Sequence, residues 1–482
     1  MTAPRLASFV NGAFRPAAGG TFVDDINPSD KEDVVALVPE GTPADAGPVV
    51  EAASRAFPAW SALTGPARAE HLHRWAGTIA ARHEEIAQAM AREVGKPIGE
   101  ARGETARAVA ILRYTAGEAV REIGEVIPAQ APGALQFTLR QPLGPVALIT
   151  PWNFPLAIPL WKAAPALAFG NTVVLKPAEA ASHLATLLAE TSALAGLPPG
   201  VFNVLMGSGR IVGEPLLEDE RIKAVSFTGS SVVGARVAHI ASRRNIRYQT
   251  EMGGKNVAIV LPDADLDLAA TLTASGAMRF AGQKCTATSR VVVVKSVEEA
   301  FLAKLKAKVE ALPLGPVTDP ASAVGPLIAE SARKFAGEAV GTSNARLLTG
   351  GMPPVDPRFS KGFFYEPTVL CELAEDAAAA TEELFAPVLA SFVAADLDEA
   401  LLLANRTPFG LSAALFTRDI KSALHYIHRI EAGLVRVNGD TTGVDPHAPF
   451  GGVKGSSSGS REQGRAAREF YTEIKTVQIG PG

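Results

Sequence analysis

An alternation of short apolar runs with longer helical segments constrains the fold of this chain more than any other feature of its sequence. Helical spacing follows each of four apolar runs, at residues 145–150, 171–176, 201–205 and 224–228. Short buried strands that alternate with helices form parallel βαβ units. The alternation begins again after Glu251, with runs at 257–260 and 290–294. The sequence therefore predicts an α/β protein with two doubly wound parallel sheets.

The segments outside this alternation have other patterns. Asn11-Gly12 between short apolar stretches predicts a β-hairpin. Residues 43–124 are alanine-rich with helical spacing, and residues 124–141 indicate an exposed hairpin that leaves this helical layer. The tail at 470–479 alternates like a strand but has no local partner. Its edge needs cover from that hairpin or from another subunit, so we expect a homodimer or a homotetramer.

Composition excludes several kinds of partner. Hydrophobic residues make up 47% of the chain and charged residues 20%, which is enough apolar material for a large core. The net charge is −4 and the basic residues form no stripe, so no nucleic acid partner is expected. Two cysteines cannot form a disulfide framework, and no run approaches the roughly 20 apolar residues of a membrane span. With no signal-like N-terminus, we expect a cytoplasmic protein with no membrane partner.

Polar residues interrupt the predicted strands and helices in a set of short blocks. Three blocks end strands or open helices, at 150–155 (TPWNFP), 249–256 (QTEMGGKN) and 280–286 (FAGQKCT). Four more lie at 176–179 (KPAE), 227–230 (FTGS), 382–388 (EELFAPV) and 449–454 (PFGGVK). Taken in chain order, the seven blocks extend over nearly the whole chain and resemble the aldehyde dehydrogenase superfamily.

The resemblance implies both a reaction and a domain plan. The reaction is NAD(P)+-dependent oxidation of an aldehyde to a carboxylic acid, through a cysteine thiohemiacetal and a thioester that water hydrolyses. The plan is a dinucleotide-binding domain at 1–122 and 143–251 and a catalytic domain at 252–452. A hairpin at 123–142 and a C-terminal strand at 453–482 would serve oligomerisation.

Cys285 is the candidate nucleophile. A single cysteine without context is most often a buried small hydrophobe. Here Gly282 and Gln283 precede it and Thr286 follows, so it lies in a polar turn. We expect this turn to lead into a helix, whose backbone amides would favour the thiolate. The resemblance implies that Cys285 attacks the aldehyde carbon.

Asn153 and Glu251 complete the predicted catalytic set. The tetrahedral alkoxide needs hydrogen-bond donors that are in place before it forms. The resemblance gives this role to the Asn153 amide, although an asparagine between two prolines also suits a turn. The resemblance makes Glu251 the base that activates water, and a carboxylate there indicates hydrolysis instead of transfer to coenzyme A. Apolar surroundings would raise its pKa toward the working pH.

The predicted cofactor is NAD or NADP, with NAD favoured. Gly209 lies in a glycine-containing turn that opens a helix, and Gly229-Ser230 offers a second helix N-terminus for a pyrophosphate. A carboxylate at Glu179 would accept the ribose hydroxyls and repel a 2′-phosphate. The resemblance adds further cofactor contacts from Trp152, Lys176, Glu383 and Phe385.

The substrate is less constrained. Residues 284–290 and 452–464 resemble one branch of the family, the α-ketoglutarate semialdehyde (2,5-dioxopentanoate) dehydrogenases. Lys284 or an arginine would meet the anionic end of such a substrate, or Lys284 points to solvent. Phe154 and Trp161 would form apolar walls, and Thr286 would lie beside the substrate. Succinate semialdehyde or a broad range of aldehydes remain alternatives.

Other readings of the same residues stay open at this point. A cofactor-independent thiol esterase would also use Cys285 and Glu251, and a non-catalytic binding protein could share the fold. Glu462 occupies a family position linked to proton relay, but a solvated role is equally compatible with the sequence. No metal site is expected, because His425 and His428 have no third ligand nearby.

Overall fold

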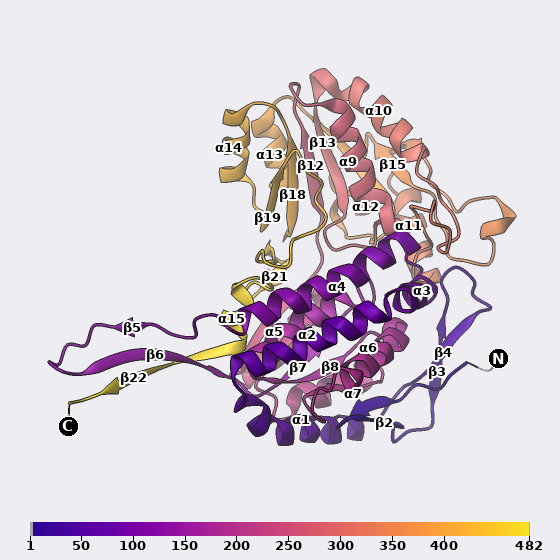
Figure 1. The fold of residues 1–482 in the computed structure, drawn as a ribbon. Helices are drawn as coiled ribbons and strands as arrows, with labels where there is room; N and C mark the ends of the chain where they lie inside the picture. The colour runs from indigo at the N-terminus through magenta and orange to yellow at the C-terminus, as the bar shows by residue number, and fades with distance from the viewer. Residues whose placement is uncertain (1–2, 482) are drawn as a thin grey trace.

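The protein, a computed structural model that describes residues 3–481, has two α/β lobes and a projecting β-arm (Figure 1). An eight-stranded sheet lies at the centre of the first lobe and a seven-stranded sheet at the centre of the second. The arm is a separate three-stranded sheet. The predicted fold class, with two doubly wound sheets, is confirmed.

The first lobe is built on five parallel strands. They are β7 (Pro145–Ile149), β8 (Thr172–Lys176), β9 (Phe202–Val204), β10 (Ala224–Thr228) and β11 (Arg247–Glu251). Their spatial order is β9-β8-β7-β10-β11, so the order reverses between β7 and β10. The connecting helices are α5 (Ala157–Ala168), α6 (Ser182–Leu194), α7 (Gly209–Glu218) and α8 (Ser231–Arg243). In an open α/β sheet, ligands bind beyond the carboxyl ends of the strands at such a reversal.

The N-terminal segment covers this sheet with helices. They are α1 (Ala46–Ser61), α2 (Gly65–Ala81), α3 (His83–Val94) and α4 (Ile98–Glu118). The α2 helix begins after Thr64, whose hydroxyl accepts a hydrogen bond from the Ala67 amide at 3.3 Å. The α3 helix ends at Gly95, whose φ of 67° suits the left-handed C-terminal position. Pro97 then precedes α4, which begins at the junction of the lobes and leads toward the arm (Figure 1).

The predicted Asn11-Gly12 hairpin is present at one edge of the first sheet. It joins β1 (Ser8–Val10) to β2 (Ala13–Arg15), with φ of 53° at Asn11 and 81° at Gly12. Both residues take the positive φ that a two-residue hairpin turn requires. A second antiparallel pair, β3 (Phe22–Ile26) and β4 (Val34–Pro39), follows.

The second lobe repeats the α/β plan. Its sheet has the order β14-β15-β16-β13-β12-β18-β19. The strands are β12 (Asn256–Val260), β13 (Thr288–Val294), β14 (Arg346–Thr349), β15 (Thr368–Cys371), β16 (Val388–Ala394), β18 (Ser412–Phe416) and β19 (Leu434–Val437). The helices are α9 (Leu266–Met278), α10 (Glu298–Glu310), α11 (Glu330–Gly341), α12 (Ala378–Thr381), α13 (Leu397–Asn405) and α14 (Ile420–Arg429). The edge strand β14 runs antiparallel to its neighbour.

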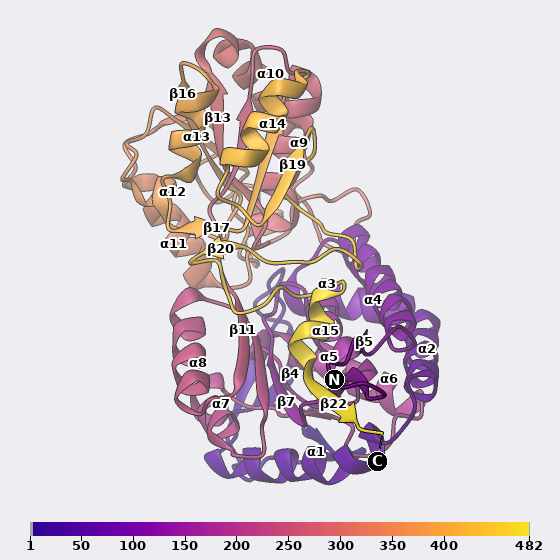
Figure 2. The same ribbon diagram turned by 90° about the vertical axis from the view of Figure 1, so that its left-hand side faces the viewer.

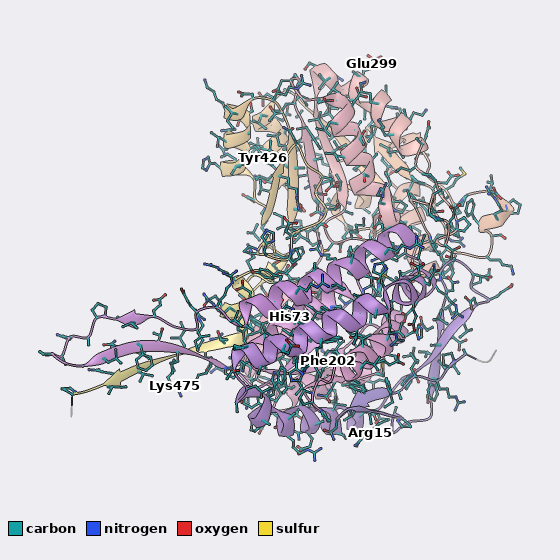
Figure 3. All side chains as sticks on the ribbon, viewed as in Figure 1. Arg15, His73, Phe202, Glu299, Tyr426 and Lys475 are labelled. Atoms are coloured by element: carbon teal, nitrogen blue, oxygen red, sulfur yellow. The ribbon has the colours of Figure 1, made fainter. Side chains whose placement is uncertain are left out.

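Each lobe has its own apolar core. Figure 3 labels one core residue in each lobe, Phe202 in the first and Tyr426 in the second. In the first lobe the Trp75 and Phe202 rings meet edge to face, with centroids 5.0 Å apart. In the second lobe Tyr426 is fully buried among aliphatic residues. Among the helices of residues 3–481, none combines the length and apolar character needed to cross a membrane.

The arm pairs the C-terminal tail with the internal hairpin. Strand β22 (Thr472–Ile479) runs antiparallel to β6 (Leu135–Pro142) along its whole length, and β5 (Val126–Ile127) pairs with the other edge of β6. The tail therefore finds its partner in the hairpin of the same chain, one of the two partners that we expected. The arm extends away from both lobes (Figure 1).

Of the segment predicted at 453–482 to serve oligomerisation, residues 453–471 lie on the body of the molecule. Strand β20 (Val453–Lys454) pairs with β17 (Phe409–Gly410) in the second lobe, and β21 (Ser457–Ser458) pairs with β11 in the first. Helix α15 (Ala466–Tyr471) then packs against α5 (Figure 2). Its side chains Ala467, Phe470 and Tyr471 are buried, and this burial holds residues 453–471 on the body of the molecule. Only the strand that follows joins the arm.

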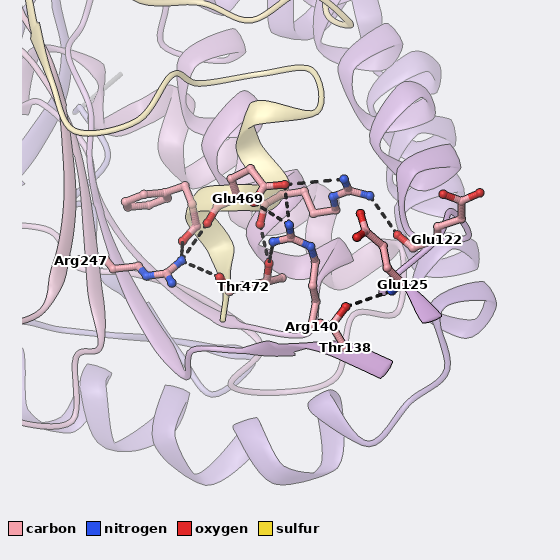
Figure 4. Close-up of polar contacts among 9 residues, drawn as sticks. Glu122, Glu125, Thr138, Arg140, Arg247, Glu469 and Thr472 are labelled. Atoms are coloured by element: carbon pink, nitrogen blue, oxygen red, sulfur yellow. Dashed lines mark hydrogen bonds and ion pairs between the residues drawn. The ribbon is translucent and has the colours of Figure 1, made fainter. Parts of the chain in front are cut away.

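A polar cluster fixes the base of the arm (Figure 4). One nitrogen of the Arg247 guanidinium donates to the carbonyls of Glu469, Phe470 and Thr472, at 2.8, 3.2 and 2.5 Å. Arg140, from β6, pairs with the Glu469 carboxylate at 2.6 Å and donates to the Thr472 hydroxyl at 3.2 Å. The last carbonyls of α15 have no partners within the helix, and the hydrogen bonds from Arg247 satisfy them.

Candidate active site

The predicted catalytic residues meet where the two lobes join. Asn153 follows β7, Glu251 ends β11, and Cys285 lies in the turn before β13. Hydrogen bonds between residues far apart in the sequence tie the loops together, including Asn153 to Gln283 and Ser457 to Glu251. Both the end of β7 and the end of β11 lie at the carboxyl edge of the first sheet.

Cys285 lies in a turn that leads into a strand, so the predicted helix after it is wrong. The turn follows a 3-10 segment at Arg279–Gly282 and enters β13 at Thr288. Buried β-branched residues after the turn favour a strand over a helix. The backbone amides of Cys285 and Thr286 do face the sulfur and lower its pKa, as a helix start would. Burial and the charges of Glu383 and Glu251 outweigh them and raise the pKa of the thiol to about 12.

The Asn153 side chain points at the cysteine turn. Its amide nitrogen donates to the Gln283 carbonyl at 3.0 Å, and the residue is 3% exposed. An amide nitrogen carries two hydrogens, so one donor remains for a ligand. The turn itself is held from the other side by Asn256, which donates to the Cys285 carbonyl at 2.8 Å.

Glu251 is a buried carboxylate with one free oxygen. The Ser457 hydroxyl donates to Oε2 at 2.5 Å, and Oε1 has no hydrogen-bond partner among residues 3–481. Burial and the charge of Glu462 raise the pKa of Glu251 well above its ordinary value, while the Ser457 hydrogen bond lowers it. The backbone of Gly451 is so close that a Cβ there would lie 2.7 Å from Oε1.

Aromatic rings lie beside the loops that carry Asn153 and Cys285. Trp152 meets Phe385 edge to face at 5.7 Å and Phe280 at 6.4 Å, and Phe154 meets Phe280 at 6.5 Å. Phe280 and Phe385 both have left-handed backbones, with φ of 54° and 52°. That conformation costs about 1–3 kcal/mol for a bulky residue and persists only where surrounding contacts fix it. Phe154 lies beside these rings, and its contact with a substrate stays a prediction.

A cavity of about 540 Å³ opens at the other cofactor residues. Its lining includes Lys176, Glu179 and Gly209 with residues from α7 and α8. Helix α7 begins at Gly209 and α8 begins just after Ser230, so two helix N-termini lie at this edge. The size suits a nucleotide, and amides at helix N-termini suit its phosphates. The residues present therefore fit a dinucleotide.

Glu179 is already placed at one of these helix ends. Its Oε1 accepts a hydrogen bond from the Gly209 amide at 2.9 Å and lies 4.0 Å from the Lys176 ammonium. Glu383 takes a similar position at another loop, where it accepts from the Gly254 amide at 3.0 Å. Burial raises the pKa of Glu383 to about 7.

Comparison with known proteins gives the family. The model of the aldehyde dehydrogenase family matches residues 14–477. The chain belongs to the aldehyde dehydrogenase family. A relative from Bacillus subtilis, named alpha-ketoglutaric semialdehyde dehydrogenase, is 44% identical over 480 residues and 98% of each chain. An alpha-ketoglutarate semialdehyde dehydrogenase from Haloferax volcanii is 40% identical over 474 residues and 98% of each chain.

Solved structures of aldehyde dehydrogenases share the whole fold. An NAD-dependent aldehyde dehydrogenase from Sinorhizobium meliloti superposes with a TM-score of 0.96 at 37% identity, over 99% of this chain and 95% of the other. An NADP-dependent enzyme from E. coli gives 0.95 at 35% identity, over 99% and 98%. Solved structures similar to this chain therefore include an NAD-dependent and an NADP-dependent enzyme.

Lys284 does not present a free charge in this aldehyde dehydrogenase. Its ammonium pairs with Glu100 of α4 at 2.8 Å, and its side chain is 12% exposed. Because of this pairing, Lys284 neither points to solvent nor keeps an uncompensated charge for a substrate. The sequence does not reveal Glu100 as its partner. Thr286 is also buried, and its carbonyl accepts from Thr441 at 2.6 Å.

Trp161 and Glu462 belong to one buried cluster. The Trp161 indole donates to Glu462 at 2.7 Å, and its ring packs on Phe450 with centroids 5.3 Å apart. Glu462 is 1% exposed and also accepts from Ser226 and Lys162, so the solvated alternative is wrong. The indole N–H of Trp161, which we predicted to form an apolar wall, thus points at the buried Glu462 carboxylate.

The sequence did not identify several residues that support the site. Ser457, Lys162 and the pair Lys96–Glu104 contact catalytic or neighbouring groups from distant segments. Their signal in the sequence is weak, since a serine, a lysine or a glutamate is most often a surface residue.

His425, considered as a metal ligand, pairs with Asp398 at 2.7 Å. Within residues 3–481 no group of three candidate ligand side chains is assembled for a metal ion.

Proposed function

We propose that this aldehyde dehydrogenase oxidises a small semialdehyde to its acid at Cys285, with Asn153 and Glu251 as its catalytic partners. The observation that carries the proposal is the convergence of three groups at the junction of the lobes. They are a thiol facing two amides, an amide with a spare hydrogen, and a buried carboxylate with a free oxygen. Thiol, oxyanion donor and base are the parts that thioester chemistry needs.

The first step forms a carbon–sulfur bond. The Cys285 thiol loses its proton to a base, and Glu251 is suited because its charge already acts on that thiol. The sulfur then adds to the aldehyde carbon, and the carbonyl oxygen becomes the alkoxide of a thiohemiacetal. The spare Asn153 hydrogen and the backbone amide of Cys285 stabilise this negative charge.

The second step is loss of hydride from the same carbon. When it is bound, oxidised nicotinamide supplies the acceptor for the two electrons and the hydrogen. The alkoxide electrons reform the carbonyl, which leaves an acyl group on Cys285 as a thioester. Trp152, Phe280 and Phe385 keep bulk water from this chamber.

Water then releases the acid. Glu251 first releases the thiol proton to solvent. As a carboxylate it then takes a proton from water through its free Oε1, and the resulting hydroxide attacks the thioester carbonyl. The carbon–sulfur bond breaks, the sulfur recovers a proton, and a carboxylic acid leaves. For the whole reaction, one aldehyde, one water and one oxidised nicotinamide yield a carboxylate, a reduced nicotinamide and two protons.

We infer that NAD+ is preferred over NADP+. The Glu179 carboxylate lies at the N-terminus of α7, inside the cavity that would hold the adenosine half. It would accept hydrogen bonds from ribose hydroxyls and repel a 2′-phosphate. Lys176 would lie beside the same ribose, and Gly229 and Ser230 beside the pyrophosphate.

The domain roles follow from these sites. The first lobe would bind the dinucleotide, the second would carry the nucleophile, and the arm would serve assembly into a homodimer or homotetramer. The arm supports this role because it leaves Val126 and Ile474 exposed at 78% and 58% on a sheet with open edges.

We propose α-ketoglutarate semialdehyde as the substrate, on the names of the relatives from Bacillus subtilis and Haloferax volcanii. Because Lys284 is paired, Arg107 is the better cation for its carboxylate. Arg107 lies one turn after Glu104 on α4 and donates to the Val444 carbonyl, and its Nε has no partner within residues 3–481. Arginine can bind a carboxylate through two parallel hydrogen bonds.

A panel of aldehydes tests this proposal. Reduced nicotinamide is measured with NAD+ or NADP+ and with 2,5-dioxopentanoate, succinate semialdehyde or butanal. We expect the highest kcat/KM for 2,5-dioxopentanoate with NAD+, and no oxidation by Cys285→Ala. Arg107→Met should lower kcat/KM for the anionic substrates about 10-fold or more and leave butanal nearly unchanged. Equal losses for butanal would remove Arg107 from the proposal, and ester cleavage without nicotinamide reduction would favour an esterase.

A further inference from the structure

A buried ion pair lies directly behind the Asn153 loop. Lys96 sits between α3 and α4, and Glu104 lies on α4, with exposures of 0% and 4%. The ammonium and the carboxylate are in direct contact. Burial lowers the pKa of Lys96, and the charge of Glu104 acts against that shift.

Lys96 contacts both sides of the active site. Its ammonium donates to the Asn153 carbonyl at 2.6 Å. It also lies 4.0 Å from the ring centre of Phe154 and 4.4 Å from that of Phe280. Such cation–π contacts are strongest where water is excluded. Phe280 begins the segment that carries Cys285, so one ammonium group touches the loop of the amide and the loop of the thiol.

Glu104 holds the other end of the Asn153 loop. Its Oε1 accepts hydrogen bonds from the backbone amides of Leu156 and Ala157, both at 3.0 Å. Leu156 and Ala157 begin α5, where amides lack helical partners and favour a negative charge. The pair therefore binds both ends of the Asn153 loop, the start through Lys96 and the end through Glu104.

The energetics of the pair point to a role in geometry. Taking both charges out of water costs several kcal/mol per ion, and hydrophobic residues of similar volume are often as stabilising. Apolar residues could not make the hydrogen bond to the Asn153 carbonyl or the two hydrogen bonds with amides of α5. A displacement of about 1 Å in a catalytic group can cost about 100-fold in rate.

We propose that Lys96 and Glu104 are positioning residues that fix the Asn153 amide opposite Cys285. The inference rests on the proposed role of Asn153 as the oxyanion donor. Neither side chain of the pair contacts the reacting atoms. They act through the backbone of the Asn153 loop, so their effect on the rate should disappear when the Asn153 amide is removed.

A double-mutant cycle on an ester tests the proposal without nicotinamide. The burst of 4-nitrophenol from 4-nitrophenyl acetate reports acylation of Cys285, which needs the thiol and the oxyanion donors. We expect Asn153→Ala to slow the burst by about 10²–10³-fold. Lys96→Met should slow it about 10- to 100-fold. The double variant should be no slower than Asn153→Ala alone.

Controls separate positioning from general damage. Lys304→Met removes a lysine that pairs with Asp267 at 2.7 Å on the surface, and it should leave the burst unchanged. Glu104→Gln keeps an oxygen for the α5 amides while removing the charge, and it replaces Lys96→Met in the cycle if that variant does not fold. Thermal unfolding of each variant records the loss of stability separately from the burst rate.

Each outcome decides a different claim. A full-rate burst from Asn153→Ala would overturn the proposed role of Asn153. A slow burst from Asn153→Ala, slowed by a further 10-fold or more in the double variant, would overturn the positioning role alone. Unchanged bursts from Lys96→Met and Glu104→Gln would overturn it as well.

Discussion

At the scale of the residue, the site contains groups whose pKa values are shifted by burial. The thiol of Cys285 and the carboxyls of Glu251 and Glu383 all have raised pKa values, because the lobes enclose them in a cleft with little water. A thiol with a pKa near 12 is a weak nucleophile at neutral pH. The reaction therefore depends on a neighbouring base and on prepared hydrogen-bond donors.

Glu251→Gln tests the base directly. Glutamine keeps the size of the side chain but cannot take a proton from water. We expect one equivalent of reduced nicotinamide per active site in a rapid phase, followed by turnover reduced about 10²–10⁴-fold. Stopped-flow absorbance with 2,5-dioxopentanoate and NAD+ measures both phases, and steady turnover at the wild-type rate would remove Glu251 as the base.

Ser457→Ala tests how the pKa of Glu251 is set. The base works as a carboxylate, so activity falls as the pH drops through its pKa, which lies above the ordinary range. The Ser457 hydroxyl donates to the ionised carboxylate and lowers that pKa. Removing the hydroxyl should move the acid limb of the kcat profile to higher pH, with a several-fold loss at low pH and little change on the alkaline plateau. Ser457→Thr keeps a hydroxyl and should restore the limb, whereas a uniform loss at every pH would indicate damage unrelated to titration.

At the scale of the element, the arm depends on how α15 ends. Figure 4 shows Arg247 at the point where the helix becomes β22, with three carbonyls around one guanidinium nitrogen. Arg140 attaches the neighbouring strand to the same place. The direction of the arm therefore depends on contacts from β11, in the first lobe, to the start of β22.

Arg247→Ala should loosen the arm without unfolding the lobes. The substitution leaves partly buried carbonyls without donors, which costs about 1–3 kcal/mol. Amides of residues 472–479 should exchange with deuterium about 5- to 100-fold faster, while amides of β7 remain protected. Arg243→Ala is a matched control, because within residues 3–481 that arginine pairs only with Glu218 and its side chain is 61% exposed. Equal exchange in Arg247→Ala and the control would exclude this anchoring role.

At the scale of the whole molecule, the arm is the surface that we expect to assemble the subunits. Its sheet is too thin to bury a core of its own, and its large apolar residues are exposed. Symmetric pairing with a second copy would cover them.

Ile474→Asp tests this surface. A charge on the exposed face of β22 should weaken assembly, because it would be buried without a partner. Light scattering after size exclusion should show a smaller species for Ile474→Asp at micromolar concentration. Leu194→Asp changes a residue that is 68% exposed on the body and should leave the mass unchanged. A single mass for wild type and both variants would argue against assembly through the arm.

The sequence by itself determined the fold class, the family and the identity of the chemical groups. Apolar periodicity specifies the two parallel sheets, and glycine and proline positions specify turns such as Asn11-Gly12, because both act over a few neighbouring residues. Only the tertiary structure decided what surrounds each charge. Lys284 is neutralised by Glu100, Glu462 is buried, and Lys96 reaches Asn153, all through contacts between distant segments. Burial and Coulomb interactions depend on distance in space, and the spacing of residues along the chain does not encode that distance.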